Sequence, residues 1–152
     1  MPIPLALQHA SEDFERFLAD ARDGAGLATR NQTYTMVEGV LRTFRRRLTP
    51  AEAIRFAQVL PPVLRAIFVS DWDLSLAPLP FGDRASLTRE VQGLRQHHNF
   101  APETCIADVA AAVRRASDPA AFDAVLETLP PGAADFWRVP AAAPSPAPHA
   151  ER

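Results

Sequence analysis

Apolar side chains recur three or four positions apart through residues 11–47, the spacing of one buried face of an α-helix. Ser11 is the predicted N-cap of a first helix. Gly24 and Gly26 are predicted to end it, because glycine tolerates the left-handed conformation common after a helix. A second helix is predicted over about residues 31–47. The apolar positions of the two helices are Phe14, Phe17, Leu18 and Ala21, then Met36, Val37, Val40, Leu41, Phe44 and Leu48.

The stretch Leu48–Phe68 contains the clearest start and stop signals of the chain. The run Thr49-Pro50-Ala51-Glu52 has the spacing of a capping box, with proline at the first helical position. This third helix is predicted to end at Leu60-Pro61-Pro62, because proline has no amide hydrogen to continue the bonding. A short fourth helix is predicted to follow the prolines and to run through Val69.

A weaker copy of this pattern follows in residues 86–138. Asp118-Pro119 corresponds to the earlier threonine and proline, and Leu129-Pro130-Pro131 repeats the double-proline break. Two copies of a unit that cannot bury its apolar face alone are expected to pack together. The sequence therefore predicts an all-α fold, one compact bundle of seven or eight helices built from two related halves, residues 11–69 and 86–138, with a connector over residues 70–85.

Differences between the copies separate core positions from peripheral ones. Ile54 corresponds to Asp123, so we expect Ile54 to be peripheral despite its apolar side chain. The positions that are apolar in both copies are expected to face the core: Ala53, Phe56, Ala57 and Leu60, with Phe122, Val125, Leu126 and Leu129.

The end of the second copy has weaker helix formers than the first. Residues 131–137 include Gly132, and glycine inside a helix costs about 1 kcal/mol relative to alanine. We predict that this segment is the less stable end of the bundle, with amides that exchange faster than those of residues 36–44. Residues 139–152 are rich in proline and alanine and lack an apolar pattern, which predicts a flexible tail.

Composition narrows the class of protein. Hydrophobic residues are 47% of the 152 residues and charged residues 22%, values typical of a globular chain with a sizeable core. The net charge of −2 argues against a surface that is basic throughout. The 16 basic residues are all arginine, which we attribute to a GC-rich bacterial genome. A single cysteine excludes an internal disulfide, and no signal peptide or long apolar run is visible. We expect a cytoplasmic protein without membrane contact.

Four short motifs mark the first half: Arg47-Leu48, Glu52-Ala53, Leu60-Pro61 and Leu64-Arg65. With these motifs the run from Val40 to Phe68, continued by Asp71-Trp72, resembles the bacterial family called domain of unknown function 2267. The resemblance covers most of residues 12–137 and implies a helical fold. In the second half the first motif becomes Ala116-Ser117 and the last becomes Ala133-Ala134. No catalytic residues are defined for that family, so the resemblance implies no chemistry.

Arginines near the end of the second predicted helix are the first candidate for a site. In one interpretation Arg42, Arg45, Arg46 and Arg47, with Arg55 and Arg65 near them in sequence, form a phosphate- or acid-binding surface. In the other they are helix-end cations paired with acidic neighbours, because they point in several directions around the helix. Arg45 and Arg46 correspond to Arg114 and Arg115 of the second copy, so we expect this corner to face solvent.

Three further groups have structural explanations. Adjacent His97 and His98 point to different sides of a helix, without metal-ligand spacing. Cys105 corresponds to Met36 of the first copy, which predicts a small buried residue. Trp72 lies between two aspartates and is predicted to cover one end of the core, with an exposed anchor or a cation-binding loop as the alternative. We expect no catalytic residue, no metal site and no cofactor.

The function that this pattern favours is a small non-catalytic helical module that binds or regulates a protein partner, or associates with itself. Its predicted interaction surface consists of residue types that suit interface anchors: Arg42, Arg45, Arg46, Ile54, Arg65, Trp72 and Arg115. Two alternatives stay open. One is a helical nucleic-acid binder that uses Arg42, Arg45, Arg46 and Arg115. The other is an apolar-ligand carrier or enzyme with a pocket between the halves.

Overall fold

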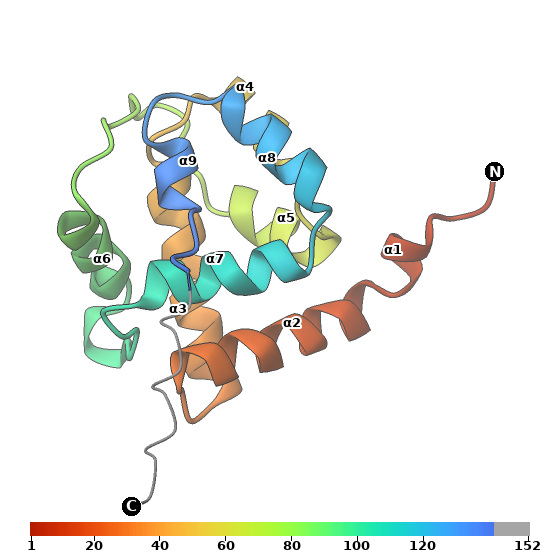
Figure 1. Cartoon of the computed structure of the whole chain (residues 1–152), viewed down its shortest axis with the longest axis horizontal. Helices are drawn as coiled ribbons and strands as arrows, with labels where there is room; N and C mark the ends of the chain where they lie inside the picture. The colour runs from red at the N-terminus through yellow and green to blue at the C-terminus, as the bar shows by residue number, and fades with distance from the viewer. Residues whose placement is uncertain (142–152) are drawn as a thin grey trace, which may run out of the picture.

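The computed structural model of the protein describes residues 1–141, and within this range the regular structure is entirely helical (Figure 1). The helices are α1 (Leu5–Gln8), α2 (Ala10–Ala25), α3 (Arg30–Arg45), α4 (Pro50–Ala57), α5 (Pro62–Val69), α6 (Arg84–Gly93), a 3₁₀ turn (Gln96–His98), α7 (Cys105–Arg115), α8 (Pro119–Glu127) and α9 (Ala133–Phe136). The all-α prediction is confirmed, while the duplication into two halves stays a prediction. None of these helices is long and apolar enough to cross a membrane.

The first two helices begin differently from the prediction. Ser11 was predicted to cap α2, but α2 begins at Ala10 and no side chain caps its first turn. The reason is that the residues before α2 are themselves helical, as α1. The amide of His9 donates to the carbonyl of Leu5, and the carbonyl of His9 accepts from the amide of Asp13, both at 2.9 Å. Gly26 ends α2 as predicted, in a left-handed conformation with φ of 67°, whereas Gly24, also predicted to end the helix, lies within it.

Helix α3 is the central element of the bundle and packs against α2, α5, α6 and α7 (Figure 1). It begins at a capping box formed by Thr29 and Gln32, slightly before the predicted start. In its middle Gly39 allows α6 to approach closely. A Cβ atom on Gly39 would lie 3.0 Å from the carbonyl oxygen of Val91, so any larger residue would push α6 away.

The predicted proline-marked corners are present in both parts of the chain. Thr49 and Glu52 form the capping box that starts α4, and Asp118 accepts hydrogen bonds from two backbone amides at the start of α8. Helix α4 ends at Ala57 and is followed by a turn that reaches the prolines, and α5 then spans Pro62–Val69 as predicted. These starts and stops follow from local hydrogen bonding alone.

Aromatic side chains fill the centre of the core. The largest fully buried residues include Phe44, Phe56, Phe68, Phe122, Phe136 and Trp137. The ring centroid of Trp137 lies 5.3 Å from that of Phe44 and 5.4 Å from that of Phe56, with the rings edge to face or tilted. Phe136 and Trp137 therefore anchor residues 131–137, the segment predicted to be least stable, in the core. That prediction considered helix propensity alone and did not include this packing.

The connector between α5 and α6 crosses the surface without helix, and α6 begins at Arg84. The amide of Leu79 donates to the carbonyl of Arg46 at 3.0 Å, and the rings of Trp72 and Phe81 pack against the core. Of the predicted tail, residues 142–152 lie outside the described residues.

Candidate functional site

The first candidate is the arginine group, and the structure corrects its central member. Arg45 was expected to face solvent, but only 8% of its surface is exposed. Its guanidinium donates to the carbonyl of Phe68 at 3.0 Å and of Ser70 at 2.7 Å, and lies 5.1 Å from the ring centroid of Trp72. The last carbonyls of α5 have no partner within the helix, so a buried arginine is held there to satisfy them.

The predicted arginines do come together with Trp72, around a small cavity of about 150 Å³. Arg46 donates to the carbonyl of Ala77, and Arg42 lies 3.3 Å from Glu38 and 3.4 Å from Asp71. Burial lowers the pKa of Arg45, and the charge of Arg42 adds to this effect. Because Arg45 and Arg46 already donate to main-chain carbonyls and Arg42 is paired with Glu38 and Asp71, we do not assign this cluster to nucleic acid or phosphate.

The remaining predicted residues lie elsewhere. Arg65 is half-buried and donates to the carbonyls of Ala57 and Leu60 at 3.0 and 3.1 Å, which satisfies the end of α4. Its position on an interaction surface is therefore not supported. Ile54 is peripheral as predicted, with 57% of its surface exposed. Of the residues predicted to form the interaction surface, only Arg115 lines a second, larger cavity, which is described below.

A buried carboxylate in α3 was not predicted. Glu38 is only 2% exposed, and its Oε1 atom lies 3.3 Å from Arg42 and 3.3 Å from Arg95. Acidic neighbours were expected as partners of the arginines, but the sequence did not indicate a buried carboxylate that pairs with Arg95 from a distant segment. A hydrogen bond to Glu38 raises the pKa of Tyr34 above its ordinary value of 10.0, and burial of the phenol adds to the shift.

This arrangement predicts a pH effect. The folded state holds the Tyr34 proton more tightly than the unfolded state, so the interaction stabilises the fold below the ordinary pKa of 10.0. That contribution is lost as the pH rises through the folded pKa. Tyr34 is the single tyrosine of the chain, so ultraviolet absorbance of tyrosinate reports it directly. Glu38→Gln should lower the measured pKa, while Glu12→Gln at an exposed position of α2 should leave it unchanged; equal titration of both variants would contradict the assignment.

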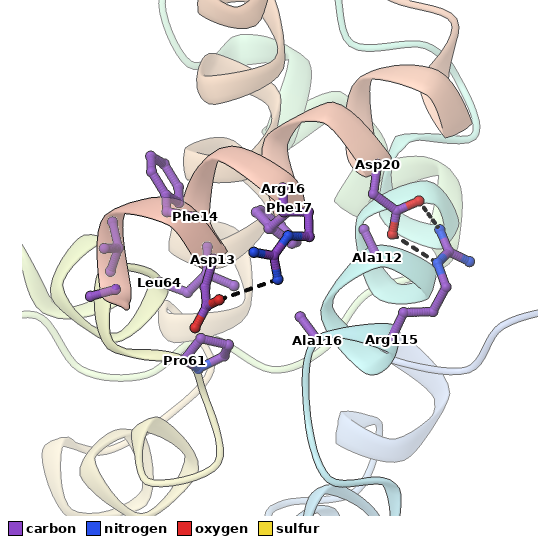
Figure 2. A pocket seen from close by; sticks show the side chains of 12 residues that line it. Asp13, Phe14, Arg16, Phe17, Asp20, Pro61, Leu64, Ala112, Arg115 and Ala116 are labelled. Atoms are coloured by element: carbon purple, nitrogen blue, oxygen red, sulfur yellow. Dashed lines mark hydrogen bonds and ion pairs between the residues drawn. The ribbon is translucent and has the colours of Figure 1, made fainter. Parts of the chain in front are cut away.

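The second candidate is an open groove of about 530 Å³, larger than the cavity of about 150 Å³ beside the arginines (Figure 2). It lies where α2, the start of α5 and the end of α7 meet. Apolar side chains form its floor: Phe14, Phe17, Pro61, Val63, Leu64, Ala112 and Ala116. The groove thus lies where α2 and α5 of the predicted first half meet α7 of the predicted second half.

Charged residues of the groove are paired with one another at its rim (Figure 2). Arg115 donates to both carboxylate oxygens of Asp20 at 2.8 and 2.9 Å, and this hydrogen bonding raises the pKa of Arg115. Arg16 lies 3.4 Å from Asp13. The pair from Asp20 to Arg115 joins α2 to α7 beside the groove. The floor is left as an apolar surface bordered by neutralised charges.

Residues with reactive side chains lie away from this groove. Cys105 is fully buried, as predicted, and burial raises the pKa of its thiol to about 11. His97 and His98 are exposed in the 3₁₀ turn. Across the described part of the chain, His, Cys, Asp and Glu form no group of three that could hold a metal ion. What the groove offers is apolar contact area with a polar border.

The family model described as "Uncharacterized conserved protein (DUF2267)" matches residues 14–136. The chain belongs to the DUF2267 family. The matched region begins within α2 and ends at the last residue of α9, so the DUF2267 unit of this protein is the whole helical bundle without α1. A comparison with curated proteins finds no match.

The motifs that carried the resemblance have structural roles in this DUF2267 protein. Arg47 is buried, donates to the carbonyl of Thr43 at 2.9 Å and pairs with Glu90 of α6. Glu52 accepts from the amide of Thr49 at 2.8 Å in the capping box, and Arg65 satisfies the end of α4. These motifs account for helix ends and packing.

Two arginine contacts favour the predicted duplication. Arg45 donates to the carbonyl of Phe68, and Arg114 donates to the carbonyl of Trp137 at 2.7 Å. Arg114 lies 69 positions after Arg45, and Trp137 lies 69 positions after Phe68. The same offset aligns the two predicted copies. Each arginine also stands over an aromatic ring, Trp72 for Arg45 and Phe122 for Arg114.

Proposed function

We propose that the protein is a non-catalytic helical interaction module that binds an apolar polypeptide segment in the groove between α2, α5 and α7. The observation that carries the proposal is the groove itself, with its apolar floor and its paired charges at the rim. An apolar centre with a polar border is the usual anatomy of a protein interface.

The predicted duplication explains why a groove is open at this place. In the predicted duplication, the packing of α3 on α6 corresponds to the packing of α7 on α2. Arg47 of the first pair then corresponds to Ala116, and Glu90 corresponds to Phe17. In the first pair the long, ion-paired side chains fill the space between the helices. In the second pair a small alanine and a phenylalanine line a cavity of about 530 Å³. The departure from the family motif at Ala116 thus coincides with a vacant apolar surface.

The shape of the groove favours a polypeptide over a compact ligand. Its lining on α2 extends from Ala10 to Asp20, about 15 Å at 1.5 Å per residue. An amphipathic helix or extended segment presents apolar side chains over such a length. The volume also falls within the range of about 300–1,000 Å³ for small-molecule sites. An apolar-ligand carrier is therefore the second candidate function.

Substitution of an exposed groove residue tests both candidates. Ala116→Arg places a charge on the floor and should abolish binding of peptides selected on the native chain from a random displayed library. Ala124→Arg, at an exposed position of α8 outside the groove, is the matched control and should bind them normally. Both variants should keep their free energy of unfolding within about 0.5 kcal/mol.

Three results of this experiment decide the matter. Selected peptides rich in apolar residues that lose binding only in Ala116→Arg support the interaction module. Peptides that bind both variants equally overturn it, because their site then lies outside the groove. Failure to select any peptide, with Ala116-dependent binding of the fluorescent probe anilinonaphthalene sulfonate, supports the ligand carrier instead.

A further inference from the structure

The first eight residues form an apolar arm that is not packed against any part of residues 9–141. Every residue from Met1 to His9 is exposed. The exposed fractions of the large apolar side chains are 63% for Ile3, 69% for Leu5 and 53% for Leu7. Figure 1 shows α1 projecting past the start of α2, away from the rest of the bundle. Apolar area held in water forgoes about 25 cal/mol per Å² of burial, so such an arm favours a partner surface.

A surface of matching character, which residues 1–141 leave open, begins where the arm ends. Ala10, the first residue of α2, already lines the groove, and the groove floor continues through Phe14 and Phe17. Residues 1–8 carry no charged side chain. A charged segment would leave unpaired charges against the apolar floor, because the rim residues are already paired with one another. The side chains of the arm, none of them charged, meet this surface without that cost.

The backbone at the junction directs the arm away from its own groove. His9 is held on both sides, by its amide donating to Leu5 and its carbonyl accepting from Asp13, each at 2.9 Å. Folding the arm back over α2 would reverse the chain at His9 and break these hydrogen bonds. Pro2 and Pro4 further restrict the arm, since proline fixes φ. Entry into the groove of another molecule requires no such reversal.

We propose that residues 1–8 dock in the α2–α5–α7 groove of a second copy of this chain, and that two copies exchange arms about a two-fold axis. The inference rests on the proposed function of the groove and names its occupant. Exchange of identical arms gives a self-complementary interface in which each contact occurs twice. The family match begins at residue 14, so the arm adds this contact to a bundle that is complete without it.

Concentration-dependent sedimentation of the full chain tests the exchange. The native chain should form dimers, and Leu5→Asp with Leu7→Asp should weaken dimerisation by at least about tenfold, as charges on the arm oppose burial. Ala116→Arg should weaken it similarly from the groove side. The matched control is Leu74→Asp with Leu76→Asp, on connector residues with exposed fractions of 63% and 53%. This control should dimerise like the native chain.

A mixture of the two defective variants gives the sharpest result. The arm variant keeps an intact groove and Ala116→Arg keeps an intact arm, so one arm-in-groove contact can form between them. The mixture should associate more strongly than either variant alone. A native chain that stays monomeric at millimolar concentration overturns the exchange, as does a control that dissociates as readily as the arm variant. Peptide binding that depends on Ala116 in a monomeric chain would leave the proposed function standing without the exchange.

Discussion

Replacing Trp137 with alanine is expected to lower the free energy of unfolding by about 3–5 kcal/mol, the range for removing a large aromatic side chain from a packed core. The indole is fully buried, and its ring centroid lies within 5.6 Å of those of Phe44, Phe56 and Phe122. These three rings come from α3, α4 and α8. Loss of the indole would open a cavity shared by helices from the whole length of the chain. Urea unfolding followed by circular dichroism measures the change.

Trp137→Phe is the informative control for this prediction. Within residues 1–141 the indole Nε1 is buried without a hydrogen-bond partner, and an unsatisfied buried donor costs about 1–3 kcal/mol. Phenylalanine keeps an aromatic ring and removes that donor, so we expect a loss below about 1.5 kcal/mol. A Trp137→Ala variant as stable as the native chain would contradict the central place of this ring in the core.

The same anchoring bears on the predicted weakness of residues 131–137. Gly132 and the short helix α9 still provide few favourable backbone interactions. Phe136 and Trp137 hold the segment to the core, and Arg84 and Arg114 donate to their carbonyls. Hydrogen exchange of this segment against residues 36–44 distinguishes local propensity from tertiary anchoring.

Replacing Arg45 with methionine is expected to lower the free energy of unfolding by about 3 kcal/mol. Methionine fills much of the space of the arginine stem but leaves the carbonyls of Phe68 and Ser70 without their donor. Each buried carbonyl that loses its partner costs about 1–3 kcal/mol. The contact of the guanidinium with Trp72 is lost as well, so the start of the connector should loosen. Thermal unfolding reports the first effect. Tryptophan fluorescence reports the second when Trp137 is replaced by phenylalanine in both chains, which leaves Trp72 as the single tryptophan.

Two variants make the Arg45 prediction specific. Arg22→Met removes an exposed arginine from α2 and should change stability by less than about 0.5 kcal/mol. Arg45→Lys keeps the charge but loses the planar donor array, so its stability should lie between those of the native chain and Arg45→Met. If Arg45→Met and Arg22→Met cost the same, the burial of Arg45 has no structural importance.

Helix ends could be predicted from the sequence because each depends on residues within one turn. The capping box at Thr49, the cap at Asp118 and the left-handed Gly26 were all predicted and are all present. The prediction of Ser11 as an N-cap was wrong for a local reason too, because hydrogen-bonded turns from α1 take the place of a cap. Periodicity likewise predicted which faces are buried. The core positions inferred from both copies are 9% exposed or less: Ala53, Phe56, Ala57, Leu60, Phe122, Val125, Leu126 and Leu129.

The candidate sites could be predicted only as residue types. Arginine at the end of α3 is compatible with a solvated cation or with a buried donor, and the choice depends on where the carbonyls of α5 lie. Glu38 is buried because Arg95, 57 positions later in the chain, reaches it. No spacing within a single helix contains that information.

By itself the sequence determined an all-α chain, its main capping and proline-marked helix ends, its buried faces and its membership of a helical family, because hydrogen bonding and periodicity act over a few residues. The tertiary structure alone decided which arginines are buried and where an apolar surface stays open. The ion pair beside the groove joins Asp20 and Arg115, which are 95 positions apart. A groove exists only where such distant helices pack with small side chains between them, so its place follows from packing and not from local pattern.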